Sequence, residues 1–126
     1  MEMSREVLLG ILDAYSYEIV FVDRNHIVQY MNKTAKERYE GRVEVGKCLF
    51  NCHNEKSQKK IEEFLARADE GEEEMFELYN KKTGEREFFV PVRVDHKVIG
   101  YFERHEVNWD KDKPEVSVVK YWLNRR

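Results

Sequence analysis

Two cysteines and a histidine in the middle of the chain are the residues best suited to chemistry. Cys48, Cys52 and His53 form a Cys-x-x-x-Cys-His arrangement. Covalent haem attachment uses Cys-x-x-Cys-His, in which both thiols bond the porphyrin and the adjacent histidine ligates iron. The spacing here is one residue longer and disfavours covalent attachment. Axial ligation of a non-covalent haem by His53 needs only a neutral imidazole beside an apolar cavity.

The same three residues allow other interpretations. A zinc site would need a fourth ligand from one of the other histidines. A reversible disulfide between Cys48 and Cys52 would need a distorted backbone, because Cα atoms four residues apart on a helix lie near the distance limit for a bridge. In the plainest interpretation the cysteines are small, partly buried apolar residues, and His53 or Asn54 caps the following helix. These alternatives stay open, and our prediction includes no metal site.

Aromatic and polar residues on the expected strands are further candidates for ligand contact. We expect Tyr30 and Phe50 to line a ligand or cofactor pocket together with Cys48, Cys52 and His53. Because neighbouring residues on a strand face opposite sides, only one of Arg104 and His105 can point inward.

The composition indicates one soluble domain with an ionised surface. The 126 residues are 41% hydrophobic and 37% charged, which provides a core and a charged exterior. Acidic and basic residues are interleaved, with a net charge of -3, so no basic footprint for nucleic acid is present. No apolar run approaches the roughly 20 residues that span a bilayer, and the N-terminus does not resemble a signal peptide. We expect a cytoplasmic protein with reduced thiols and no membrane association.

The sequence lacks the patterns that are typical of enzymes. We find no nucleophile paired with a base, no defined pair of catalytic acids and no glycine-rich phosphate loop. The run Glu72-Glu73-Glu74 is explained by a solvated surface. We therefore expect a protein that is not an enzyme.

The first half of the chain predicts a helix, a β-hairpin and a second short helix. Val7, Leu8, Ile11 and Leu12 recur at helical spacing behind an N-capping Ser4. Two β-rich runs flank the turn residues 23–26. The expected elements are a helix at Arg5–Tyr15, strands at Tyr17–Val22 and Ile27–Met31, and a helix at Thr34–Tyr39 capped by Asn32.

The second half predicts one long helix followed by three strands. Ile61, Phe64, Leu65 and Ala68 form one apolar stripe within Ser57–Asp69. Pro91 cannot donate a ladder hydrogen bond and predicts a bulge or an outward-facing edge. The expected strands are Glu74–Tyr79, Glu85–Val94 and Lys97–Val107, followed by a linker and an apolar run at Val116–Leu123.

The order of these elements predicts an α+β fold. Hairpin-length links between the last three strands exclude an all-parallel sheet. We expect one five-stranded antiparallel sheet with helices packed on one face. The domain boundaries that follow are an N-terminal helix at residues 1–16, the main α+β domain at 17–107 and a C-terminal tail at 108–126.

Three segments carry a resemblance to a known family: EIVFVDRNHIVQYMNKTA, VGKCLF and VIGYFERHEV, with Gly100 in the last. The chain resembles the PAS domain family over roughly Leu8 to Val107. The segment GKCLFNCHNEKSQKKIEEFL is similar to a PAS subgroup with a Cys-His pair before the long helix.

The resemblance implies a free-standing sensory or regulatory domain that binds a small ligand or cofactor and signals through contacts with a separate protein. The apolar face of the first helix can either pair with its copy in a homodimer or pack on the chain's own sheet, and the sequence allows both. Two alternatives remain open: a haem-binding gas or redox sensor that uses His53, and a ligand-free dimerisation module.

Overall fold

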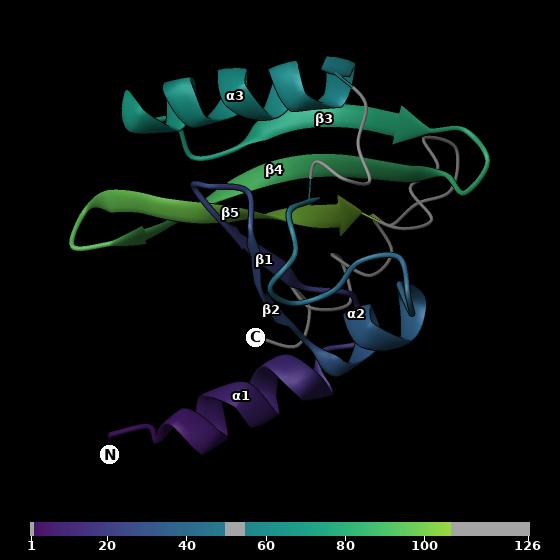
Figure 1. The fold of residues 1–126 in the computed structure, drawn as a ribbon, viewed down its shortest axis with the longest axis vertical. Helices are drawn as coiled ribbons and strands as arrows, with labels where there is room; N and C mark the ends of the chain where they lie inside the picture. Colours follow the sequence, from purple (N-terminus) through teal and green to yellow (C-terminus); the bar gives the residue numbers. More distant parts are fainter. Residues whose placement is uncertain (1, 50–54, 107–126) are drawn as a thin grey trace, which may run out of the picture.

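The structure, a computed structural model, describes residues 2–49 and 55–106. Within these ranges the chain forms three helices and five strands (Figure 1). The helices are α1 (Arg5–Ala14), α2 (Lys33–Arg38) and α3 (Glu55–Asp69). The strands are β1 (Val20–Asp23), β2 (Val28–Met31), β3 (Met75–Asn80), β4 (Glu85–Val94) and β5 (Lys97–Glu106). Their order and bounds agree with the sequence prediction to within a few residues.

The five strands form one antiparallel sheet in the order β2-β1-β5-β4-β3. β1, from the N-terminal hairpin, pairs with β5, the last strand of the chain, in the centre of the sheet. Val22 pairs with Tyr101 and Asp23 with Gly100. This short seam joins the N-terminal hairpin to the three-stranded meander. The predicted α+β fold with a single five-stranded antiparallel sheet is confirmed.

The core lies on one face of the sheet, beneath α3. Ile61, Phe64, Leu65 and Ala68 of α3 are buried, as their helical spacing predicted. The ring of Phe64 packs against Phe89 of β4 and Tyr101 of β5, with centroids 5.3 and 5.9 Å apart. Such aromatic contacts add to the stabilisation that burial of the rings provides. We call this covered side the inner face.

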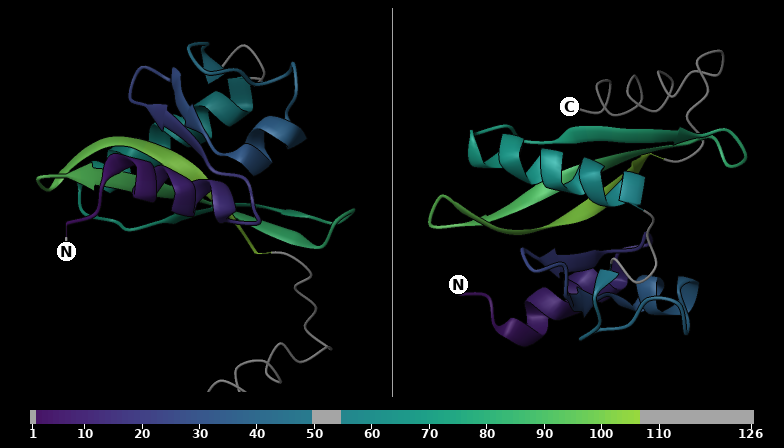
Figure 2. Two further views of the ribbon diagram at one scale, coloured as in Figure 1. Left: turned by 90° about the horizontal axis from the view of Figure 1, so that it is seen from below. Right: turned by 45° about the horizontal axis from the view of Figure 1, so that its top comes forward.

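Helix α1 lies on the other side of the sheet from α3. Figure 1 places α1 and α3 at opposite ends of the view, and in the left view of Figure 2 α1 crosses in front of strands that separate it from α3. Ser4 caps α1 by accepting a hydrogen bond from the Val7 backbone N–H. None of the residues of α1 is fully buried.

Asn32 ties α1, the hairpin and α2 together. Its side chain is fully buried, and its amide nitrogen donates to the carbonyls of Leu12 and Tyr17. Its amide oxygen accepts from the backbone N–H groups of Ile19 and Ala35, which confirms the predicted helix cap. Every hydrogen-bonding position of a buried amide is used in this way, which fixes the start of β1 beside α2.

Pro91 lies inside β4, at a position that the pairing with the neighbouring strand β3 does not reach. β3 pairs with β4 only as far as Phe89, so among the described strands Pro91 has β5 alone as its partner. The register shifts immediately afterwards, between Val92 and Arg93. Both features agree with the predicted bulge or open edge. The predicted apolar run at Val116–Leu123 lies outside the described residues.

None of the helices in the described part of the chain has the length and apolar character needed to span a bilayer.

Candidate functional site

A pocket opens on the inner face where β1 and β5 separate. The two strands pair only at Val22 and Asp23, and no backbone pairing between them continues along the second half of β5. The pocket has a volume of about 140 Å³ and mostly apolar walls. Its lining comprises Glu18, Val20, Val22, Tyr39, Val43, Leu49, Tyr101, Phe102, Glu103 and His105. A cavity of about 150 Å³ lined by apolar side chains holds one benzene molecule, so this pocket fits a small ligand.

Strand alternation explains which side chains face the pocket. Tyr101 packs on α3, so Glu103 and His105, two and four residues later, share the inner face. Continuing the β1–β5 register from Val22 and Tyr101 places Glu18 opposite His105. Arg104 points to the outer face, where its guanidinium lies 4.2 Å from the centre of the Phe88 ring. The expected division between Arg104 and His105 is therefore observed, with His105 inside.

Glu18 is the most heavily contacted carboxylate of the pocket. Only 5% of its side chain is exposed, and its Oε1 accepts hydrogen bonds from Arg38 Nη1 at 2.6 Å and from the Tyr39 hydroxyl at 3.3 Å. The same oxygen lies 3.2 Å from His105 Nδ1. Burial and the Glu18 charge both raise the pKa of Tyr39, so its hydroxyl stays protonated as a donor. The end of α2 thus anchors one wall of the pocket.

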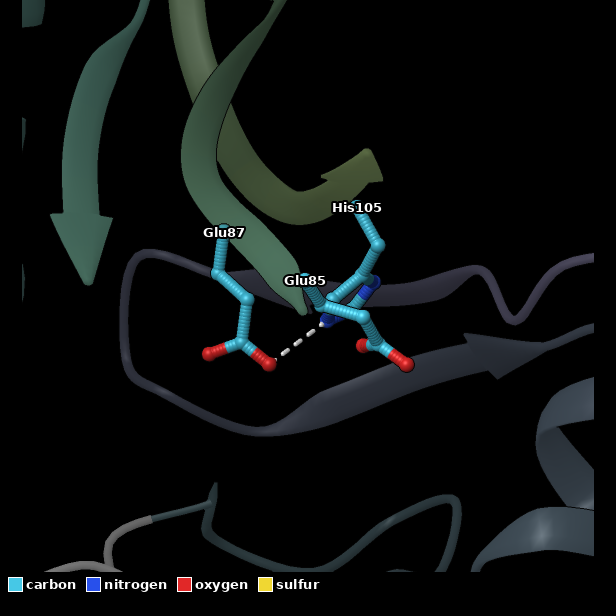
Figure 3. Close-up of side chains that lie close together, drawn as sticks. All are labelled: Glu85, Glu87 and His105. Atoms are coloured by element: carbon cyan, nitrogen blue, oxygen red, sulfur yellow. Dashed lines mark ion pairs between the residues drawn. The ribbon is translucent and has the colours of Figure 1, made fainter. Parts of the chain in front are cut away.

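More carboxylates gather beside His105, on the neighbouring strands. Glu85 and Glu87 alternate on β4 and face the same side as His105 (Figure 3). His105 Nε2 lies 3.2 Å from Glu87 Oε1 and 3.8 Å from Glu103 Oε2. The β3–β4 register shifts between Phe76 and Leu78, and the intervening Glu77 joins Glu87 and Glu103 on the inner face. We call Glu77, Glu85, Glu87, Glu103 and His105 the carboxylate–histidine cluster.

The ionisation of the cluster is strongly perturbed. Burial, reinforced by repulsion from Glu103 and Glu87, raises the pKa of Glu77 to about 8. Burial and the nearby Glu87 raise the pKa of Glu103 to about 7. Burial opposes the charged form of His105, but contacts with Glu87 and Glu18 outweigh it and raise the pKa of the imidazole. The cluster consequently retains protons near neutral pH, a property that is common at functional sites.

The predicted site residues fall in different places. Cys48 is a half-buried free thiol whose backbone bridges Ile27, beside the pocket residue Leu49. Tyr30 is not in the pocket lining, and its hydroxyl donates to Asp13 of α1. Phe50, Cys52 and His53 lie outside the described residues, so their predicted cofactor contacts stay predictions.

The carboxylate–histidine cluster was not predicted from the sequence. A signal for it exists, because Glu85 and Glu87 precede Phe89 with the period of two that defines one face of a strand, and Glu103 and His105 follow Tyr101 in the same way. These charged residues continue an apolar inward face. Glu77 gives the same signal, because it follows Met75, which packs against the core, at a spacing of two residues.

Comparisons with known proteins agree with the architecture. A family model described as PAS domain matches residues 8–99. The chain belongs to the PAS domain family. The resemblance noted in the hairpin and the closing strand is thereby confirmed, and among the curated proteins none matches the chain.

Solved structures show that the PAS fold extends over most of the chain. A C-terminal domain from Streptococcus mutans is 20% identical with a TM-score of 0.66, and the match covers 83% of this chain and 85% of that one. The PAS domain of Bordetella pertussis BvgS is 13% identical, with a TM-score of 0.59 and coverage of 95% and 94%. A sensory box sensor histidine kinase from Vibrio cholerae is 16% identical, with a TM-score of 0.52 and coverage of 80% and 88%. PAS domains are typically sensory and signalling modules.

Proposed function

We propose that this PAS domain is a sensory module that binds a small ligand in the pocket between β1 and β5 and transmits its occupancy through protein–protein contacts. The pocket itself is the observation that carries the proposal. It combines apolar walls with convergent polar groups from Glu18, Glu103 and His105, a combination that is typical of small-molecule sites. Fold similarity to a sensor histidine kinase supports a signalling role.

The size of the pocket favours a compact ligand. Its volume of about 140 Å³ is below the roughly 300–1,000 Å³ of cavities that hold drug-sized molecules. A tetrapyrrole is larger than most such molecules, so the described pocket favours a small organic ligand over haem. We propose that this pocket has a sensory and not a catalytic role. We place the domain in the cytoplasm.

The effect of ligand binding would pass from the pocket wall to α1. Glu18 in the wall is followed by Ile19, whose backbone N–H is held by Asn32, and Asn32 also holds the Leu12 carbonyl of α1. A ligand that favours one packing of this wall over another would shift the population of α1 positions. The exposed apolar face of α1 is the proposed contact surface, with a second copy of the chain as its occupant and a separate signalling protein as the downstream partner.

Native mass spectrometry of the purified chain, combined with a pocket-filling variant, tests the ligand proposal. We expect a bound species of low mass on the wild-type protein. Val20 lines the pocket and is only partly buried, so Val20→Phe should fill the space and abolish this species. Val94→Phe enlarges an exposed residue at the end of β4 and should retain it.

Thermal unfolding and the visible spectrum complete this test. Both variants should unfold cooperatively, so that loss of the ligand is not loss of the fold. A wild-type chain that carries no small molecule, or a Val20→Phe variant that keeps one, would contradict the pocket proposal. A visible haem band that disappears in His53→Ala would instead favour the haem sensor.

A further inference from the structure

We propose that Glu85, Glu87 and His105 bind a divalent first-row transition-metal ion on the inner face of the sheet. One ligand atom from each of these residues, an imidazole nitrogen of His105 and one carboxylate oxygen of each glutamate, lies within 4.8 Å of the other two (Figure 3). The proposal does not depend on an organic ligand, because Glu85 and Glu87 are outside the lining of the pocket.

The distances in the cluster match those between ligands of one ion. Ligand atoms bound at about 2.0–2.1 Å to a tetrahedral ion lie about 3.3 Å apart. His105 Nε2 and Glu87 Oε1 are 3.2 Å apart, and Nε2 and Glu103 Oε2 are 3.8 Å apart. The side chains come from two adjacent, paired strands, with Glu87 directly opposite His105. Paired strands hold their side chains more rigidly than loops do, which suits a metal site.

Buried polar atoms in the cluster lack partners, which points to a missing ligand. His105 has only 3% of its side chain exposed and is directed at Glu87. Within the described part of the chain, the buried Oε2 atoms of Glu85 and Glu77 have no hydrogen-bond partner, and the nearest cation to Glu85 Oε2 is Arg38 at 4.0 Å. Buried carboxylate oxygens without a partner destabilise a fold, so each such atom calls for a physical explanation. A cation bound by Glu85, Glu87 and His105 supplies one for Glu85.

Glu18 provides the outer support that histidine ligands usually have. A metal at Nε2 fixes the neutral imidazole with its hydrogen on Nδ1, and Nδ1 lies 3.2 Å from Glu18 Oε1. Glu18 is itself held by Arg38 and Tyr39. A carboxylate that orients a histidine toward a metal is a recurrent arrangement in metalloproteins. Glu18 in the pocket wall would therefore hold the His105 ring in the orientation that directs Nε2 toward the proposed ion.

The donor set and local charge define the class of ion. Glu18 and the four carboxylates of the cluster face only three basic side chains among the described residues: Arg38, Lys60 and His105. Carboxyl groups outnumber the basic side chains around the site, which suits a divalent cation that displaces the retained protons when it binds. Imidazole with carboxylates suits Zn²⁺, Fe²⁺ and Mn²⁺, whereas Mg²⁺ prefers oxygen ligands alone. Zn²⁺ is the probe of choice because it is not redox-active.

Calorimetric titration of the metal-stripped full chain with Zn²⁺ tests the proposal. We expect one ion per chain from this site, no comparable binding of Mg²⁺, and a Zn²⁺-dependent rise in the thermal midpoint. Glu87→Gln should weaken Zn²⁺ binding by at least about 10-fold and remove the rise in midpoint. The variant relieves repulsion between carboxylates and should remain folded without metal. Glu37→Gln, on the exposed surface of α2, is the matched control and should bind Zn²⁺ as the wild type does.

The cysteine pair needs its own control, because thiolates also bind Zn²⁺. In the Cys48→Ser/Cys52→Ser variant the cluster should still bind one Zn²⁺, and Co²⁺ should bind without a thiolate charge-transfer band. Loss of all Zn²⁺ binding in this variant would overturn the proposal. Unchanged binding in Glu87→Gln, or absence of binding in the wild type, would overturn it as well. Val20→Phe tests the pocket proposal, so failure of that proposal can be distinguished from failure of the metal-site proposal.

Discussion

Asp23 ends β1 and holds the turn that follows it. Its Oδ1 accepts hydrogen bonds from the backbone N–H groups of Asn25 and Ile27, and its Oδ2 accepts one from Gln29 Nε2. Partial burial disfavours the charged carboxylate, but these three hydrogen bonds outweigh that effect and lower the pKa of Asp23. The ionised side chain therefore fixes the hairpin that carries one wall of the pocket.

The first prediction is that Asp23→Asn lowers the free energy of unfolding at pH 7 by about 1 kcal/mol, because charge-assisted hydrogen bonds become neutral ones. A carboxyl group with a lowered folded-state pKa stabilises the fold above its unfolded value near 3.8, and this stabilisation is lost as pH falls through the folded pKa. Wild-type stability should thus fall more steeply below pH 4 than that of the variant. Urea unfolding between pH 3 and 7 measures both slopes, and parallel curves would show that Asp23 has no such role.

The residues of the site differ in how well the sequence predicts the direction of their side chains. The inward direction of His105 follows from strand alternation once β5 is recognised, and the structure places it there. Glu85 and Glu87 obey the same rule, yet charged residues are usually assigned to the solvent face, so they were missed. Glu77 follows the same rule from the core residue Met75 and was missed for the same reason.

At the scale of elements, Gly100 makes the seam between β1 and β5 possible. A Cβ built on Gly100 would lie 2.7 Å from Cε1 of Phe21 and closer still to the backbone oxygen of Val22. The two strands are joined by only two residue pairs, and Gly100 belongs to one of them. The glycine that marked the closing strand in the sequence is thus required for close approach of two backbones.

We therefore predict that Gly100→Ala lowers the free energy of unfolding by about 1–3 kcal/mol, because the seam must shift to admit the methyl group. Gly10→Ala is the matched control, since a Cβ at this α1 position meets nothing within 4 Å. The control should be neutral or stabilising by up to about 1 kcal/mol, because alanine favours a helix more than glycine does. Equal stability of the two variants in urea unfolding would refute the steric argument.

The elements themselves were predictable because local chemistry marks them. Ser4 and Asn32 cap helices, the α3 stripe repeats at helical spacing, and the meander strands end at turn residues. The side of the sheet on which α1 lies was not predictable. The sequence shows that the helix has an apolar face but not which surface that face packs against. That placement depends on contacts far apart in the sequence, such as Asn32 with Leu12.

At the scale of the whole molecule, α1 is fixed in place while its apolar face stays open. Asp13 of α1 accepts hydrogen bonds from the Lys33 backbone N–H and the Tyr30 hydroxyl. An isolated ten-residue helix is marginal in water, so such contacts are needed to hold it. Val7, Leu8, Ile11 and Tyr15 are nevertheless each more than 40% exposed. Ile11 and Tyr15 also line an apolar groove of about 540 Å³ between α1 and β5.

A contiguous apolar surface of this kind marks an interaction site, and two copies of it are self-complementary about a two-fold axis. We predict a concentration-dependent dimer in sedimentation equilibrium, with a dissociation constant raised at least about 10-fold by Leu8→Lys, because a charge would be buried at the interface. Val94→Lys alters an equally exposed apolar residue at the far end of β4 and should leave the dimer intact. A wild-type chain that remains monomeric at millimolar concentration would refute the homodimer. Equal weakening by both variants would show that association is not through α1.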